Sequence, residues 1–74
     1  MRDARIGEQV RVRRGATITR RRERRVQTGN GATGTVRQVW RGDRQALVQL
    51  DADALRYTVA LRDLRPVRQE APAS

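Results

Sequence analysis

The chain contains no cysteine and no histidine. Without cysteine it has no disulfide bridges, thiolate metal sites or thiol nucleophiles. Without histidine it lacks the most common general base and the most common metal ligand. The serines, threonines and acids form no pattern typical of catalysis. We therefore expect a protein that is not an enzyme and that holds no metal or cofactor.

Long apolar runs are missing as well. No apolar stretch approaches the roughly 18 residues of a membrane helix, and residues 1–7 lack the apolar segment of a signal peptide. These absences predict a cytoplasmic protein with no membrane partner. A length of 74 residues is sufficient for one small domain with a thin core.

The charge is strongly one-sided. Lysine is absent, all 17 basic residues are arginine, and the 8 acidic residues leave a formal net charge of +9. Residues 11–25 carry eight arginines against one glutamate, residues 37–44 carry three arginines against one aspartate, and the rest of the chain is balanced. A surface that is merely solvated mixes both signs. The pattern therefore predicts a polyanionic partner, with nucleic acid ahead of an anionic membrane surface.

Apolar and polar residues alternate with a period of two, which is typical of short strands. The predicted strands cover residues 9–13, 36–40, 46–51, 55–62 and 65–67, with one helical turn over 62–64. Adjacent Val39 and Trp40 predict a bulge or a buried strand end. Residues 20–25 fit either a helical turn or a loop, and residues 69–74 are expected to be a disordered tail.

Several segments resemble the small barrels of KOW-type proteins, which occur in transcription elongation factors and ribosomal proteins. The similar segments are Gly7-Glu8-Gln9-Val10-Arg11-Val12, Gly31-Ala32-Thr33-Gly34-Thr35-Val36-Arg37-Gln38-Val39 and Ala46-Leu47-Val48-Gln49-Leu50-Asp51. Residues 57–67 are similar to the close of these barrels. They are also similar to the SH3-like module of RecD-type and relaxase helicases, which lies beside single-stranded DNA.

The resemblance implies an all-β fold. We expect a five-stranded SH3-like barrel over residues 1–68, with an arginine-rich loop after the first strands and the tail over residues 69–74. Between residues 14 and 30 the chain departs from the KOW pattern, because the arginine-rich loop replaces a compact turn.

Three short motifs have a simpler structural explanation than a functional one. Residues 29–34 match the G-x-G-x-x-G pattern of dinucleotide sites, but a predicted strand and not a helix follows them. Residues 41–43 spell Arg-Gly-Asp and are predicted to form a hairpin turn. Asp51 and Asp53 lie two residues apart in a predicted turn, where aspartate is a common turn former.

The candidate binding residues are the arginines of the basic segments and one aromatic ring, because guanidinium groups match phosphate and rings stack on bases. They are Arg11, Arg13, Arg14, Arg20, Arg21, Arg22, Arg24, Arg25, Arg37, Trp40, Arg41 and Arg44. Tyr57 shares the phase of Leu55 and Val59 and is predicted to lie in the core. Trp40 fits either stacking with partial exposure or core packing.

These residues predict a non-catalytic accessory or regulatory protein that binds DNA or RNA through phosphates, with little sequence specificity. The alternative is an interaction module or inhibitor that docks on an acidic patch of a polymerase, helicase or nuclease. A third interpretation is that the charge serves solvation alone.

Overall fold

The regular elements of the described residues are β-strands and one 3₁₀ turn. The computed structural model describes residues 4–20, 24–28 and 31–67. The elements are β1 (Gln9–Val12), β2 (Thr17–Arg20), β3 (Arg24–Gln27), β4 (Thr33–Trp40), β5 (Gln45–Leu50), β6 (Arg56–Ala60), the 3₁₀ turn η1 (Leu61–Asp63) and β7 (Leu64–Pro66). The described part of the chain contains no helix with the length and hydropathy needed to cross a bilayer. The predicted all-β class is confirmed.

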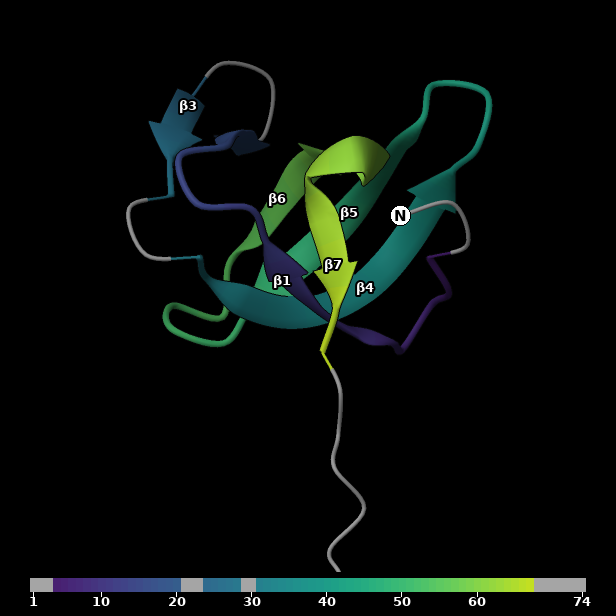
Figure 1. Cartoon of the computed structure of the whole chain (residues 1–74), viewed down its shortest axis with the longest axis horizontal. Helices are drawn as coiled ribbons and strands as arrows, with labels where there is room; N and C mark the ends of the chain where they lie inside the picture. The colour runs from purple at the N-terminus through teal and green to yellow at the C-terminus, as the bar shows by residue number, and fades with distance from the viewer. Residues whose placement is uncertain (1–3, 21–23, 29–30, 68–74) are drawn as a thin grey trace, which may run out of the picture.

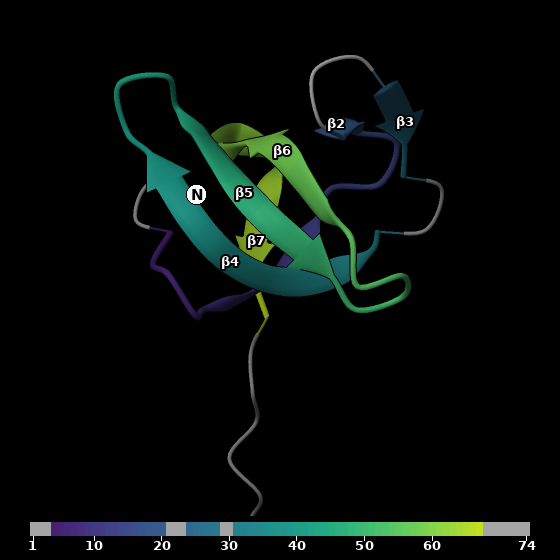
Figure 2. The ribbon, with the colours of Figure 1, turned by 180° about the vertical axis from the view of Figure 1, so that it is seen from behind.

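The seven strands form one antiparallel sheet in the order β3-β2-β6-β5-β4-β1-β7. The sheet curls over itself. In Figure 1, β1 and β7 lie in front of β4 and β5, and in the reverse view of Figure 2 β4 and β5 are in front. One face of the sheet is therefore turned inward and encloses the core.

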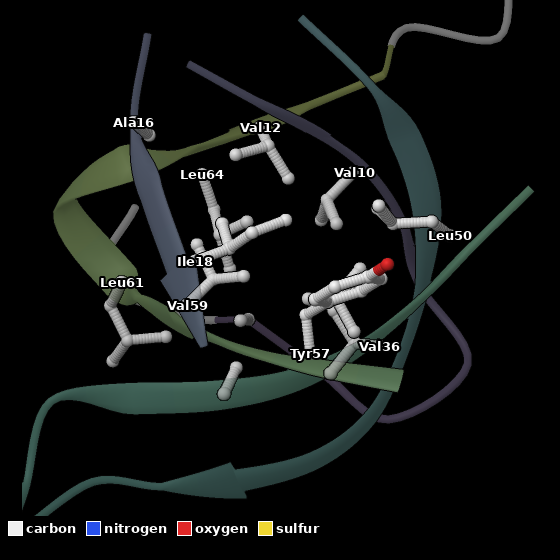
Figure 3. Packing of buried hydrophobic residues seen from close by; sticks show 13 residues of the cluster. Val10, Val12, Ala16, Ile18, Val36, Leu50, Tyr57, Val59, Leu61 and Leu64 are labelled. Atoms are coloured by element: carbon white, nitrogen blue, oxygen red, sulfur yellow. The ribbon is translucent and has the colours of Figure 1, made fainter. Parts of the chain in front are cut away.

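In the described part of the chain, thirteen buried apolar side chains form one cluster inside the curl, most of them from alternate strand positions (Figure 3). Val10 and Val12 point inward from β1, and Leu50 points inward from β5 (Figure 3). Val48 of β5 is fully buried as well. Every strand except β3 contributes at least one buried side chain. The period-two alternation thus predicted the inward residues of β1, β5 and β6 correctly, because strand side chains alternate between the two faces.

The prediction of five strands was wrong, because two further strands form within the segment expected to be a loop. Thr17–Arg20 pairs with Arg24–Gln27 as an antiparallel hairpin, with Ile18 opposite Val26. Ile18 is only 1% exposed, so burial of this one side chain anchors the hairpin to the core. A helical turn or a loop was expected over residues 20–25, but the β-branched residues of β2 favour a strand. Residues 21–23 lie outside the described residues.

The irregularity in β4 lies earlier than predicted. Val36 faces Val48 and Gln38 faces Leu47, so Arg37 is the extra residue of a bulge. One extra residue inverts the alternation of a strand. As a result Val39 packs against the core and Trp40 projects from the outer face. The bulge therefore lies at Arg37, before Val39 and Trp40, and it determines which of these two side chains faces the core.

The C-terminal end of the domain differs from the prediction by one residue. The 3₁₀ turn covers Leu61–Asp63 instead of residues 62–64, and β7 covers Leu64–Pro66. Leu61 and Leu64 both point into the core, which fixes the phase of the turn. The predicted disordered tail, residues 69–74, and the predicted domain end at residue 68 lie outside the described residues.

Gly34 permits the closest approach between strands. It stands in β4 opposite Val10 of β1 and Leu50 of β5. A Cβ atom added at Gly34 would collide with the backbone carbonyl oxygen of Gln49, and would lie 2.8 Å from a methyl carbon of Val48. A side chain at this position would therefore force β4 and β5 apart.

We predict that Gly34→Ala lowers the free energy of unfolding by about 1–3 kcal/mol, because overpacking against backbone cannot be relieved by a rotamer change. Gly42→Ala is the matched control, since a Cβ atom there meets nothing within 4 Å. Urea unfolding of both variants checks the prediction. Equal stability of the two variants would contradict the close approach of β4 and β5.

Candidate nucleic-acid interface

Arginines from three separate parts of the sequence lie along one edge of the molecule. The end of β2, the start of β3, the β4–β5 turn and η1 follow one another along the upper edge in Figure 1 and again in Figure 2. We call the arginines of these segments the arginine rim, namely Arg20, Arg24, Arg41, Arg44 and Arg62. Three of these arginines, Arg41, Arg44 and Arg62, line one hollow. The charge of Arg20 acts on Asp53 and Tyr57.

The remaining candidate arginines occupy other places in the sheet. Arg11 is exposed in the middle of β1, Arg25 faces Thr19 from β3, and Arg37 is exposed at the bulge of β4. Arg14 is exposed in the turn after β1. Arg21 and Arg22 lie outside the described residues. The candidate set is therefore spread over several surfaces, of which the rim holds the densest group among the described residues.

Arginines occupy opposite register positions on two pairs of strands. Arg11 of β1 lies opposite Arg65 of β7, and both are exposed. Arg20 of β2 lies opposite Arg24 of β3 in the register. Like charges at directly opposite positions destabilise a sheet. A bound anion would relieve this repulsion between Arg11 and Arg65.

Arg13 has a structural partner. Its Nε lies 3.1 Å from a carboxylate oxygen of Asp63, and its backbone N–H donates to the carbonyl of Asp63 at 2.6 Å. The side chain of Asp63 is 10% exposed, whereas that of Arg13 is 60% exposed. The pair joins the end of β1 to η1 and compensates a carboxylate that is almost fully buried. Arg13 was predicted as a phosphate ligand, and the structure gives it this second role.

The acids of the β5–β6 turn are used for structure. Asp51 accepts hydrogen bonds from the hydroxyl of Thr33 at 3.0 Å and from the side chain of Gln9 at 3.2 Å. Asp53 accepts from the backbone N–H of Leu55 at 2.9 Å and from the hydroxyl of Tyr57 at 2.7 Å. The prediction that both aspartates form the turn is confirmed. Within residues 4–20, 24–28 and 31–67, no group of three metal-ligating side chains is gathered.

The two aromatic residues have different environments. Tyr57 is 6% exposed and belongs to the buried cluster, as its phase predicted. Trp40 is 38% exposed at the end of β4, next to the turn that carries Arg41 and Arg44. Only Trp40 therefore presents an aromatic face to a partner.

Sequence reasoning missed Arg62. The residue belongs to a segment with equal numbers of arginines and acids, so counting charge along the chain did not single it out. The predicted helical turn was the available signal, because it places Arg62 outward between two leucines of the core.

No protein-family model matches this chain, and neither a curated protein nor a solved structure is significantly similar to it. The geometry and the charge of the described residues are therefore what a functional assignment rests on.

We predict that Arg13→Gln lowers the free energy of unfolding by about 1–3 kcal/mol, because a buried carboxylate loses a charged hydrogen-bond donor. Arg11→Gln is the matched control two residues earlier, in β1, and it should leave stability unchanged or raise it by relieving the repulsion with Arg65. Thermal unfolding of both variants checks this prediction. A control that loses as much stability as Arg13→Gln would show that the ion pair has no specific role.

The hydrogen bond between Tyr57 and Asp53 predicts a pH dependence of stability. The bond from Tyr57, followed by that from Leu55, lowers the pKa of Asp53 below 3.8. The same bond, reinforced by burial, raises the pKa of Tyr57 above 10.0. The contribution of Asp53 is complete above the pKa of the unfolded chain and is lost as pH falls. The contribution of Tyr57 is complete below pH 10.0 and is lost as pH rises.

Tyr57→Phe should therefore flatten the loss of stability above pH 10.0 and reduce the loss in acid. Melting temperatures measured across both pH ranges check this prediction. Asp43→Asn, which removes a carboxylate from a different turn, should leave both effects intact. An unchanged alkaline loss in Tyr57→Phe would contradict the assignment.

Proposed function

We propose that this protein is a non-catalytic nucleic-acid-binding factor that contacts phosphates through the arginine rim. The observation that carries the proposal is the placement of arginines from β2, β3, the β4–β5 turn and η1 along one edge of the molecule. Guanidinium groups donate two parallel hydrogen bonds to a phosphate, and a row of them follows a phosphate backbone. The factor acts as an accessory or regulatory component.

Little sequence specificity accompanies this binding mode. Contacts to phosphate position a protein on nucleic acid but carry no sequence information. The outer face of the sheet around the rim carries mainly threonine and glutamine, with Trp40 as its exposed ring. The rim therefore supplies affinity, and general electrostatic attraction dominates over reading of bases.

We also propose that the curled sheet is a barrel of the SH3-like type. Its support is the pairing of β1 with both β4 and β7, and the 3₁₀ turn that leads directly into the last strand. The hairpin of β2 and β3 would then be the long loop in which the chain departs from the KOW pattern.

The proposal predicts strong dependence on salt. With about four to six arginines on phosphates, log K should fall with log[salt] at a slope of roughly −3 to −5. Unrelated sequences should compete almost equally for the protein. Fluorescence anisotropy with labelled oligonucleotides at several salt concentrations measures both quantities. An affinity independent of salt would contradict phosphate binding.

The double variant Arg20→Gln with Arg24→Gln should weaken the slope by up to about two units, one for each lost contact. Arg5→Gln is the control, because Arg5 is exposed ahead of β1 and belongs to none of the segments of the rim. If the double variant binds nucleic acid as the control does, the arginine rim is not the interface. If the double variant also loses an acidic protein partner whose binding to the unaltered protein survives nuclease treatment, the rim is a protein-docking surface instead.

A further inference from the structure

The β4–β5 turn and η1 border an open hollow with a volume of about 770 Å³. Arg41 and Arg44 line it from the turn, and Arg62 lines it from η1. Asp43 is the one carboxylate of the lining, so the arginines outnumber it three to one. The volume lies within the roughly 300–1,000 Å³ of sites for small ligands. The hollow is therefore large enough for a small ligand, and its net positive charge would attract an anion.

Backbone hydrogen bonds hold the two sides of the hollow together. The N–H of Leu61 donates to the carbonyl of Arg44 at 2.9 Å, and the N–H of Arg44 donates to the carbonyl of Arg41 at 3.2 Å. Arg44 has a φ of 54°, a left-handed conformation that closes the turn. The three arginines are thus attached to a backbone that is already fixed before a ligand arrives. A fixed backbone reduces the ordering cost of binding.

A row of outward-facing residues connects the hollow with Trp40. Gln45 of β5 lies opposite Trp40 of β4 on one side and opposite Ala60 of β6 on the other. Gln45 and Ala60 both line the hollow. The small side chain of Ala60 leaves the hollow open, and the exposed ring of Trp40 stands one residue beyond Gln45.

We propose that the hollow binds one nucleotide of a single-stranded nucleic acid, with its phosphate on the arginines and its base stacked on Trp40. This inference rests on the proposed function and specifies the form of nucleic acid. A base inside a duplex is stacked on both faces and paired along one edge, so only an unpaired base can lie on a protein ring. Arg41, Arg44 and Arg62 supply the phosphate site, and the row formed by Gln45 and Ala60 separates this site from Trp40.

Trp40 is the only tryptophan of the chain, so intrinsic fluorescence reports on this residue alone. Short oligothymidylate should quench the fluorescence, and a blunt duplex of equal length should not do so at equal occupancy. Occupancy is measured independently by the anisotropy of a label on the nucleic acid. Unchanged fluorescence at saturating single strand would overturn the inference, as would equal quenching by the duplex.

Ala60→Gln tests the hollow without changing any charge. It should reduce both quenching and affinity for the single strand, and Trp40→Ala should weaken that affinity by roughly 5- to 150-fold. Thr58→Gln is the matched control, because Thr58 shares the strand and the outer face with Ala60 but does not line the hollow. Arg62→Gln should also weaken binding of the single strand.

The outcomes separate this inference from the proposed function. If Ala60→Gln binds like Thr58→Gln while Arg20→Gln with Arg24→Gln still loses salt dependence, the nucleotide site is wrong and phosphate binding by the rim stands. If the unaltered protein binds neither single-stranded nor duplex nucleic acid, both the proposed function and the nucleotide site are refuted.

Discussion

The buried cluster must hold together a chain whose charges repel one another. Among the described residues, thirteen apolar side chains form this cluster, and ten of them come from strands β1, β2 and β4 to β7. A chain of this length has no second core, so each of these side chains matters for the position of the others. Within the sheet, β4 and β5 are in close contact at Gly34, where no side chain fits. The arginine rim exists because this small interior fixes the ends of two hairpins and a 3₁₀ turn on one side.

Much of the core was evident from alternation, and the errors have physical causes. The inward phase of Val10, Val48 and Val59 could be predicted because each belongs to a clean period-two segment. The hairpin of β2 and β3 was missed because the arginines outweighed the signal from Ile18, and one buried isoleucine was enough to form it. The position of the bulge was missed because an extra residue becomes visible only in the pairing of two strands.

The functional residues were predictable in kind but not in arrangement. The sequence showed where arginines are concentrated, yet it could not show that Arg20 faces Arg24, or that Arg13 is joined to Asp63. It also could not place Arg62 beside Arg41, because they are separated by two strands and meet only through the fold. Charge that is counted along a chain and charge that is gathered on a surface are different quantities. The second determines which ligand can be bound.

The two edge strands of the sheet have a consequence for self-association. Unpaired strand edges are templates on which further copies of a chain can add. At one edge β7 contains Pro66, which has no backbone N–H to donate, and at the other edge β3 begins with two consecutive arginines. Proline and positive charge are both devices that prevent edge-to-edge growth. Arginines that we propose to contact a polyanion would therefore also oppose edge-to-edge contact between copies of the protein, and a polyanion that neutralises β3 would remove that protection.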